Sequence, residues 1–379
     1  MKIVFVTNFI SLHQSHIADE LYRLCDGDYT LVELTGSRNP LKMVPELLER
    51  PYLLQAWKGE AEQKRAMELV READVMMCGG NVSVLPYERE RQRTGKLLFD
   101  VSERYLKRGI INALSPTIRR YIWNYYTGNH SQMYKLCNSA FLANDLRLLG
   151  MYKNRCFKWG YFTKVSELDI DSVLAARSKD KVRIMWVSRI IDWKHPELPV
   201  LLGQRLQQDG VDYEINMLGR GDMKDKIAQL IADTHQTDRV HLLGTLPNDE
   251  VMQMMREHNI FVFTSDRQEG WGAVLNEAMA QGCCPVVADE IGAAPFLIND
   301  GQNGMLFKSR KVESLYEKVR WLIDHPAERE EMGRQAYLSM RNLWTPEIAA
   351  QRFYELSENL LAGKQIEFDE GPCSKALPV

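Results

Sequence analysis

The chain has 379 residues, of which 45% are hydrophobic and 26% charged, and its formal net charge is -3 at pH 7. A single core rarely grows beyond roughly 250 to 300 residues, so this length favours two domains. No apolar run approaches the roughly 18 residues of a membrane span, and the opening MKIVFVT is typical of a strand rather than a signal peptide, so we expect a cytoplasmic protein. The seven cysteines form no CxxC pair, which argues against a disulfide framework or structural zinc site.

Short apolar runs alternate with longer amphipathic segments through the first 160 residues. This alternation is typical of strand and helix units that build a parallel sheet. The predicted strands are residues 2–6, 29–34, 74–78, 96–101, 140–144 and 155–159. The polar stretch 161–181 that follows is interpreted as a linker.

The alternation restarts after this linker and predicts a second sheet. Its strands are residues 182–187, 213–218, 239–243, 260–264, 284–288 and 304–307. Three helical patterns end the chain, and the last begins with Thr345 as its cap and Pro346 at the first helical position. We therefore expect an α/β fold of two doubly wound domains, 1–160 and 182–345, a helix at 346–362 that returns to the first domain, and a loosely attached tail at 363–379.

Charge is distributed unevenly between the two halves. Residues 1–160 carry 23 Lys and Arg against 17 Asp and Glu, and the remainder carries 25 against 34. Either surface charge has drifted, or the front half faces an anionic partner such as a membrane surface or a phosphate-bearing acceptor. The basic stretch 89–120 leads into the aromatic segment 119–128, which fits a membrane interface, or buried aromatics beside a solvated basic edge. No recognised nucleic-acid fold accompanies it.

Charged and small residues follow the strands of the second sheet, where doubly wound folds bind ligands. Arg189 and Lys194 follow the first strand and could hold a diphosphate, although such residues are more often solvated. Gly219 and Gly221 follow the second strand and serve either as a turn or as ligand-facing backbone. After the third strand, a turn precedes Asn248, a candidate helix cap.

The segment EGWGAVLNEAMAQG follows the fourth strand and places Glu269 and Glu277 eight residues apart. Glu269 should lie in a loop, and Glu277 in the second turn of a helix that starts near Gly272. Glycines there allow close approach of an anion to free backbone amides, which suits a sugar nucleotide. An ordinary amphipathic helix with acidic residues near its start is the alternative.

The ordered set VSRIIDWK, LGRGDM, LLGTLPNDEV, SDRQEGWGAVLNEAMAQGCCPVVAD and GAAPFLINDGQNGMLF resembles family 4 glycosyltransferases. These are retaining enzymes of the GT-B fold, two Rossmann-like domains facing a cleft, with an E-x7-E signature. The resemblance covers residues 182–308 and is weak before them. It implies an acceptor-binding first domain and a nucleotide-sugar-binding second domain.

The resemblance also implies a role for each matching residue in the second domain. Arg189 and Lys194 match the diphosphate-binding pair, and Glu269 matches the carboxylate that faces the donor sugar and stabilises charge near the anomeric centre. The remaining substrate-binding matches are Glu277 at the ribose, the amides of Gly272 and Ala273 at the diphosphate, and Leu246 near the base, with Gly221 at the same edge. Such enzymes need no metal, and the departing diphosphate helps to deprotonate the acceptor.

The first domain departs from the family pattern. The loop after its first strand lacks the usual glycines, and no histidine directly follows a strand. FDVSERYLKRG occupies that position, so Ser102 and Glu103 are the candidate substitutes. His13 and His16, three residues apart on the expected first helix, are interpreted as ordinary helix residues.

The resemblance therefore implies a retaining, metal-independent glycosyltransferase. Its donor would be a UDP- or GDP-sugar and its acceptor a saccharide or lipid-linked saccharide, in bacterial cell-surface polysaccharide synthesis. A peripheral location at the inner face of the cell membrane follows by resemblance, with no nucleic-acid partner. A sugar-nucleotide epimerase of the same fold and a catalytically silent sugar-nucleotide-binding protein remain the alternatives, whereas the absence of GxGxxG after the first strand disfavours a dehydrogenase.

Overall fold

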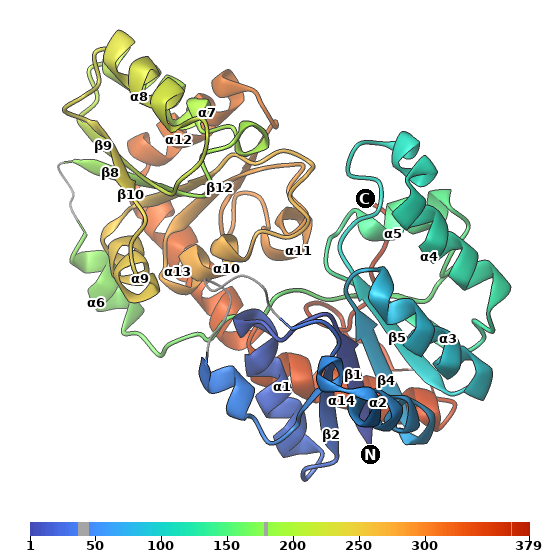
Figure 1. Ribbon diagram of the computed structural model, residues 1–379. Helices are drawn as coiled ribbons and strands as arrows, with labels where there is room; N and C mark the ends of the chain where they lie inside the picture. The colour runs from blue at the N-terminus through green and yellow to red at the C-terminus, as the bar shows by residue number, and fades with distance from the viewer. Residues whose placement is uncertain (37–44, 178–180, 365) are drawn as a thin grey trace. The chain divides into compact units, whose positions relative to one another are not determined.

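The computed structural model describes residues 1–36, 45–177, 181–364 and 366–379 (Figure 1). Its chain divides into two compact units. Unit 1 comprises Met1–Lys164 and Trp344–Val379, and unit 2 comprises Val165–Leu343. Each unit contains one parallel sheet covered by helices, so both halves have the Rossmann-like, doubly wound architecture that the alternating sequence pattern predicts.

The sheet of unit 1 has seven strands in the order β3-β2-β1-β4-β5-β6-β7. Every neighbouring pair is parallel. The strands are β1 Ile3–Thr7, β2 Tyr29–Glu33, β3 Leu53–Gln55, β4 Val75–Gly79, β5 Leu97–Ser102, β6 Met133–Cys137 and β7 Cys156–Lys158. Its longer helices are α1 Leu12–Leu24, α2 Glu60–Glu72, α3 Leu85–Thr94, α4 Pro116–Thr127 and α5 Leu142–Leu148, and the 3-10 turn η5 Ile110–Leu114 precedes α4.

One strand prediction in unit 1 was wrong. The predicted strand 140–144 runs into α5, and the true strand β6 lies earlier, in MYKLC. Lys135 interrupts the apolar run of that segment, yet its side chain is fully buried because its ammonium group donates to Asp100 at 2.6 Å and to Tyr105 at 2.9 Å. A buried ion pair thus allows a lysine inside an interior strand of the sheet.

The sheet of unit 2 has six strands in the order β10-β9-β8-β11-β12-β13. They are β8 Val182–Val187, β9 Tyr213–Leu218, β10 Val240–Gly244, β11 Ile260–Phe263, β12 Cys284–Ala288 and β13 Met305–Phe307, and all match predicted strands to within one residue at each end. The connecting helices include α7 Glu197–Gln208, α8 Lys224–Asp233, α9 Asn248–Glu257, α10 Ala273–Ala280 and α11 Ala294–Leu297, with α12 Val312–Asp324 and α13 Pro326–Asn342 after the last strand. Asn248 is the first residue of α9 rather than its cap, which is Pro247.

The predicted linker contains structure of its own. Ile170–Ala175 forms helix α6, capped by the side chain of Asp169, and α6 packs on α13 within unit 2. The buried Arg177 then donates to the carbonyl groups of Arg256, Gln281 and Gly282. The second compact unit accordingly begins before the predicted boundary at residue 182.

The last helix, α14 Pro346–Leu361, returns to unit 1, as the sequence predicts. Its cap is Thr345, whose hydroxyl accepts from the amide of Ile348 at 3.3 Å. It packs against α1 (Figure 1). Phe353 inserts beneath the sheet of unit 1, with its ring 4.9 Å from that of Phe99 and 5.7 Å from that of Trp159.

The expectation of a loosely attached tail was wrong. Lys158 donates its amide to the carbonyl of Ser374 at 2.7 Å, and Cys373 donates to the carbonyl of Lys158 at 2.8 Å. An antiparallel bridge joins Phe157 and Lys375, and the side chain of Cys373 is buried. The tail therefore pairs with edge strand β7, an interaction between backbone groups that its polar composition does not reveal.

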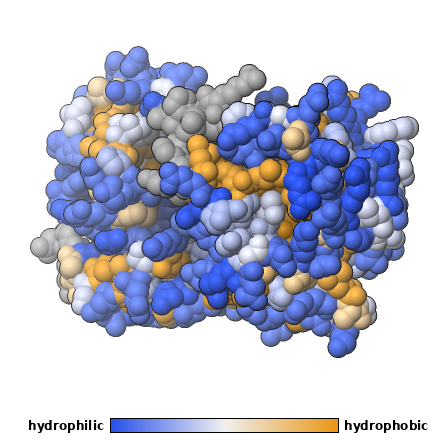
Figure 2. All heavy atoms as spheres, turned by 60° about the horizontal axis from the view of Figure 1, so that its bottom comes forward, coloured by the Kyte–Doolittle hydropathy of each residue, from blue (hydrophilic) through white to orange (hydrophobic). Residues whose placement is uncertain are grey.

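The surface is polar over most of the face shown in Figure 2, with hydrophobic side chains gathered in small groups. None of the described helices combines the length and apolarity needed to cross a membrane. All seven cysteines are buried and free of disulfides, as small core residues should be.

Candidate functional site

The loops after β8 and β11 meet through a buried ion pair in unit 2. The ammonium group of Lys194 contacts the carboxylate of Glu269, and the two side chains are 9% and 13% exposed. The hydroxyl of Ser265 donates to the same carboxylate oxygen, Oε2, at 3.2 Å. Two residues that the sequence placed at one edge of the sheet are therefore in direct contact.

Aromatic rings surround this lysine. The Lys194 ammonium lies 4.3 Å from the centre of the Trp193 ring and 5.7 Å from that of Phe263. Arg189 contacts the same Trp193 ring, with its guanidinium carbon at 5.4 Å, and its side chain is exposed. Arg189 forms no ion pair within the described part of the chain, so its five donors are available to an anion.

Helix α10 begins directly beside the Lys194–Glu269 pair. Gly272 is its cap and adopts φ +95°, a left-handed conformation that favours glycine. A Cβ at this position would lie 2.5 Å from the Phe263 ring and 3.3 Å from Cγ of Glu269. Ala273 is the first helical residue, so the amides at this helix start carry the partial positive charge of the helix N-terminus.

Glu277 lies in the second turn of α10, as predicted. Its side chain is partly buried, and loss of solvation raises its pKa to about 7. The described residues offer it neither a hydrogen-bond donor nor a cation. A carboxyl group without a protein partner at this edge of the sheet is suited to receive hydroxyl groups from a ligand.

A pocket of about 290 Å³ lies beyond the carboxyl ends of β8, β9 and β10. Leu246 and Val251 supply its apolar wall, and Arg189 and Arg220 lie at its polar side. Gly221 does not line this pocket. Its backbone packs against the preceding loop so closely that a Cβ would lie 2.0 Å from the carbonyl oxygen of Ile190, which gives Gly221 a structural role.

Unit 1 contains a larger pocket, of about 760 Å³, beyond the carboxyl ends of β1, β4, β5 and β6. Ser102 and Glu103, the candidates from the sequence, both line it. Glu103 is held from two sides, since Tyr161 donates to Oε1 at 3.1 Å and Lys107 contacts Oε2 at 2.7 Å. Buried Ser102 Oγ and Asn138 Oδ1 have no hydrogen-bond partner among the described residues, so two polar atoms at this wall are unsatisfied.

Residues 170–339 match the family described as Glycosyl transferases group 1. The chain is 31% identical to the D-rhamnosyltransferase WbpZ of Pseudomonas aeruginosa over 36% of each chain. It is 28% identical to the amylovoran biosynthesis glycosyltransferase AmsK of Erwinia amylovora over 47% of this chain and 45% of that protein. The matched segment thus spans less than half of these two relatives.

Unit 2 is thus GT4-like, since its residues 170–339 match the group 1 glycosyl transferases. The structure of Anabaena Alr3699/HepE in complex with UDP superimposes with a TM-score of 0.72 at 15% identity, covering 94% of this chain and all of that one. The structure of TarM gives a TM-score of 0.70 at 13% identity, covering 94% of this chain and 99% of that one. The chain therefore has the GT-B fold, including the front half where the sequence resemblance is weak.

Several residues of the unit 1 pocket were not identified from the sequence. His13 was interpreted as an ordinary helix residue, yet it lines the pocket and stacks on Tyr161 at 5.5 Å between ring centres. Burial lowers the pKa of His13, which keeps its imidazole neutral at pH 7. His13 is the second residue of α1 and lies beyond the loop that follows β1, so a search for histidine immediately after a strand overlooks it.

The same pocket has glycines that the sequence interpretation sought elsewhere. They lie at the end of β4 rather than after β1: Gly79 is the last residue of β4, and Gly80 follows it. Gly80 has φ +148°, and a Cβ there would lie 1.8 Å from Oδ1 of Asn8, which accepts the amide of Asn81 at 2.6 Å. The dipeptide GG after a predicted strand is the signal that could have located this turn.

Proposed function

We propose that this GT4-like protein transfers a sugar from a nucleotide-sugar donor to a saccharide or lipid-linked saccharide, with retention of anomeric configuration and without a metal. One observation carries the proposal: the Lys194–Glu269 pair lies beside the start of α10, at the carboxyl ends of the unit 2 strands. This arrangement places cations, free amides and a fixed carboxylate at one edge of a doubly wound sheet.

The donor nucleotide would occupy unit 2. Arg189 and the amides at the start of α10 bind the diphosphate, because a forked cation and a helix N-terminus both favour phosphate oxygens. Leu246 packs on the base, and Glu277 accepts hydrogen bonds from the ribose hydroxyls. UDP in the Anabaena relative of the same fold favours a UDP-sugar, and a GDP-sugar is the second choice.

Glu269 would orient the donor sugar and stabilise positive charge that develops at the anomeric carbon. Lys194 and Ser265 fix the direction of its carboxylate. The bond between the anomeric carbon and the phosphate oxygen breaks, and a new bond forms to the acceptor oxygen. The acceptor proton passes to the departing diphosphate on the same face of the sugar, so Glu269 and Glu277 do not act as a glycosidase acid and base.

The acceptor would bind in the pocket of unit 1. Glu103 offers a carboxylate held by two partners, and Ser102 and Asn138 offer oxygen atoms that no described protein group satisfies. Neutral His13 and Tyr161 add a flat, partly polar wall of the kind that sugar rings pack against. This mixture suits a hydroxyl-rich acceptor.

Cell-surface polysaccharide biosynthesis is the setting that the relatives favour. Their names include amylovoran and putative colanic acid biosynthesis glycosyltransferases and a poly(ribitol-phosphate) N-acetylglucosaminyltransferase. We place the protein in the cytoplasm, at the inner face of the membrane, where lipid-linked acceptors are exposed.

The decisive experiment screens nucleoside diphosphates and their sugars by thermal shift and then analyses products with the donor that stabilises the protein. A new glycoside with the donor's anomeric configuration, formed in the presence of EDTA, is expected. An isomerised donor without a glycoside would instead identify an epimerase. Binding without transfer or hydrolysis against a saccharide and lipid-linked acceptor pool would identify a silent binding protein.

A further inference from the structure

An exposed apolar and basic surface lies on unit 1. We define the η5–α4 surface as the exposed side chains of residues 108–126. It carries Ile110, Ile111, Leu114, Trp123 and Tyr126, which are 62%, 66%, 72%, 70% and 52% exposed. Large hydrophobic side chains with this exposure are rarely concentrated on a surface that faces only water.

Arginines accompany these apolar residues. Arg108, Arg119 and Arg120 are exposed and form no ion pair within the described ranges. Residues 104–144 contain neither Asp nor Glu, so no acidic side chain of the same segment neutralises them. The surface is therefore cationic as well as apolar.

The geometry of α4 explains why one face carries both properties. Pro116, Arg119, Arg120, Trp123 and Tyr126 recur at helical spacing, and all five are exposed. The opposite face of α4 packs toward α3, where Asn124 donates to the buried carboxyl group of Glu88 at 2.8 Å. The outward face is thus fixed by the packing of the inward face.

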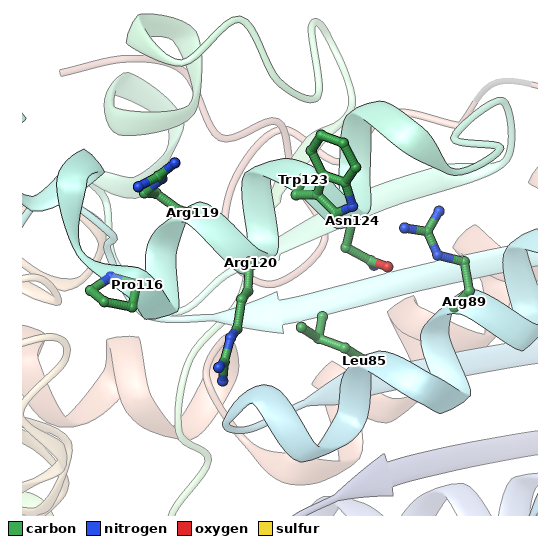
Figure 3. Close-up of a pocket in the computed structure, with 7 residues that line it drawn as sticks. All are labelled: Leu85, Arg89, Pro116, Arg119, Arg120, Trp123 and Asn124. Carbon is green, nitrogen blue, oxygen red and sulfur yellow. The ribbon is translucent and has the colours of Figure 1, made fainter.

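A groove of about 470 Å³ separates α3 from α4 (Figure 3). Leu85 and Asn124 lie between the two helices, while Arg89 and Arg120 project from α3 and α4 on either side, and Trp123 points outward from α4. The Arg89 guanidinium donates a hydrogen bond to the hydroxyl of Thr127, with 2.6 Å between Nη2 and Oγ1. This arrangement suits the boundary between phosphate headgroups and acyl chains in a bilayer. The guanidinium groups can contact lipid phosphates, while the apolar groove and the outward tryptophan can contact the acyl chains.

We propose that the η5–α4 surface docks the protein on an anionic phospholipid bilayer. The apolar side chains of η5 and Trp123 enter the headgroup region, and Arg108, Arg119 and Arg120 bind lipid phosphates. This inference deepens the proposed function and rests on it, because it identifies the surface that brings unit 1 to a lipid-linked acceptor.

One hydrogen bond connects this surface to the acceptor pocket. Tyr121 of α4 donates its hydroxyl to the carbonyl of Gly80 at 2.9 Å, and Gly80 lines the pocket. The Tyr121 ring also stacks on Tyr105 at 5.7 Å. A bilayer bound to α4 would consequently lie close to the rim of the pocket, where a lipid-linked saccharide needs to enter.

Vesicle sedimentation tests the proposal with the full-length protein. We expect it to pellet with phosphatidylglycerol vesicles at about 50 mM salt, to remain in solution with pure phosphatidylcholine vesicles, and to be released at about 0.5 M salt. Arg119→Glu/Arg120→Glu should lower the partition coefficient at least about 25-fold, since each lost cation near an anionic surface accounts for about fivefold. Leu114→Ser/Trp123→Ser should lower it at least about tenfold.

Matched variants show whether the effect belongs to this surface. Lys224→Glu/Lys226→Glu makes the same charge change on exposed α8 of unit 2, and Leu377→Ser removes a side chain that is 69% exposed elsewhere on unit 1. Both controls should pellet like the parent protein.

The docking proposal would be overturned if the control variants lost vesicle binding as strongly as the surface variants. It would also be overturned if the parent protein did not bind phosphatidylglycerol vesicles, or if inorganic phosphate alone displaced it from them at millimolar concentration. The same preparations are tested for thermal stabilisation by nucleoside diphosphate. All surface variants should retain this response, so a failed donor screen and a failed docking experiment are distinguishable.

Discussion

The ammonium group of Lys194 contacts the carboxylate of Glu269, and this contact joins the loop after β8 to the loop after β11. Ser265 donates to the same carboxylate oxygen. The sequence assigns the lysine to the diphosphate and the glutamate to the donor sugar, but the geometry makes them one unit. Lys194 therefore fixes the direction of the Glu269 carboxylate.

Lys194→Ala should lower the free energy of unfolding by about 3 kcal/mol, because it leaves a largely buried carboxylate without its cation. The double variant Lys194→Ala/Glu269→Ala should lose less than the sum of the two single variants, since no unpaired charge remains. Urea denaturation gives the free energy of unfolding of the parent protein, the two single variants and the double variant. Arg205→Ala in the exposed Arg205–Glu313 pair of the same unit is the control and should cost at most about 1 kcal/mol. Additive losses at the buried pair would show that the contact contributes no coupling.

Glu277 should make stability depend on pH. Its pKa is raised from 4.5 to about 7, so between these values the folded protein holds a proton that the unfolded chain has released. Stability from this group is present below about pH 4.5 and is lost as the pH rises through 7. In Glu277→Gln, the decrease in unfolding free energy over this pH range should be smaller by roughly 2–3 kcal/mol. Chemical denaturation between about pH 5 and 8 measures the difference between the two proteins.

The same group should link nucleotide binding to proton release. Ribose hydroxyls donate to the ionised carboxylate, so the affinity for nucleoside diphosphate should rise between about pH 6 and 8 in the parent protein. Titration calorimetry in two buffers of different ionisation enthalpy detects the released proton. Glu277→Gln serves as the reference because it lacks the ionisable carboxyl group at position 277, while the phosphates of the ligand still titrate. Identical pH profiles would remove Glu277 from the ribose site.

The sequence predicted unit 2 more completely than unit 1, and the reason is physical. Its strands β11, β12 and β13 are short uninterrupted apolar runs such as CPVVA, and the candidate residues Arg189, Lys194 and Glu269 lie in the segments that directly follow β8 and β11. In unit 1, strand β6 contains Lys135, whose charge is compensated by Asp100 from a neighbouring strand. That compensation joins residues 35 positions apart, and a local pattern cannot reveal it.

The unit 1 pocket shows the same limit for site residues. Ser102 and Glu103 were found because they directly follow the predicted strand 96–101. By contrast, His13 enters the pocket from within α1, and Tyr161 enters it from the segment after β7. Their stacking depends on how the chain folds back, which spacing does not encode. The pairing of the tail with β7 was missed for a related reason, because backbone hydrogen bonds leave little signal in composition.

Gly272→Ala should disturb the start of α10. The new Cβ would meet the Phe263 ring at 2.5 Å, in a backbone conformation with φ +95° that disfavours alanine. We expect a loss of about 2–3 kcal/mol in unfolding free energy, together with weaker nucleoside diphosphate binding. Gly210→Ala is the matched control, since Gly210 has φ +71° but a Cβ placed there would meet no atom within 4 Å, and it should cost about 1 kcal/mol. Equal losses would mean that the contact with Phe263 is easily relieved.

His13→Ala should separate acceptor binding from donor binding. His13 lines the unit 1 pocket and stacks on Tyr161, which donates to Glu103, so its removal should loosen the wall that we assign to the acceptor. We expect acceptor-dependent kcat/KM to fall at least about tenfold, chiefly through KM, while thermal stabilisation by nucleoside diphosphate is unchanged. His16→Ala, three residues further along α1 and outside the pocket, controls for loss of an imidazole from the helix. If both variants lose activity equally, the effect arises from α1 as a whole; if His13→Ala transfers at the parent rate, this wall does not contact the acceptor.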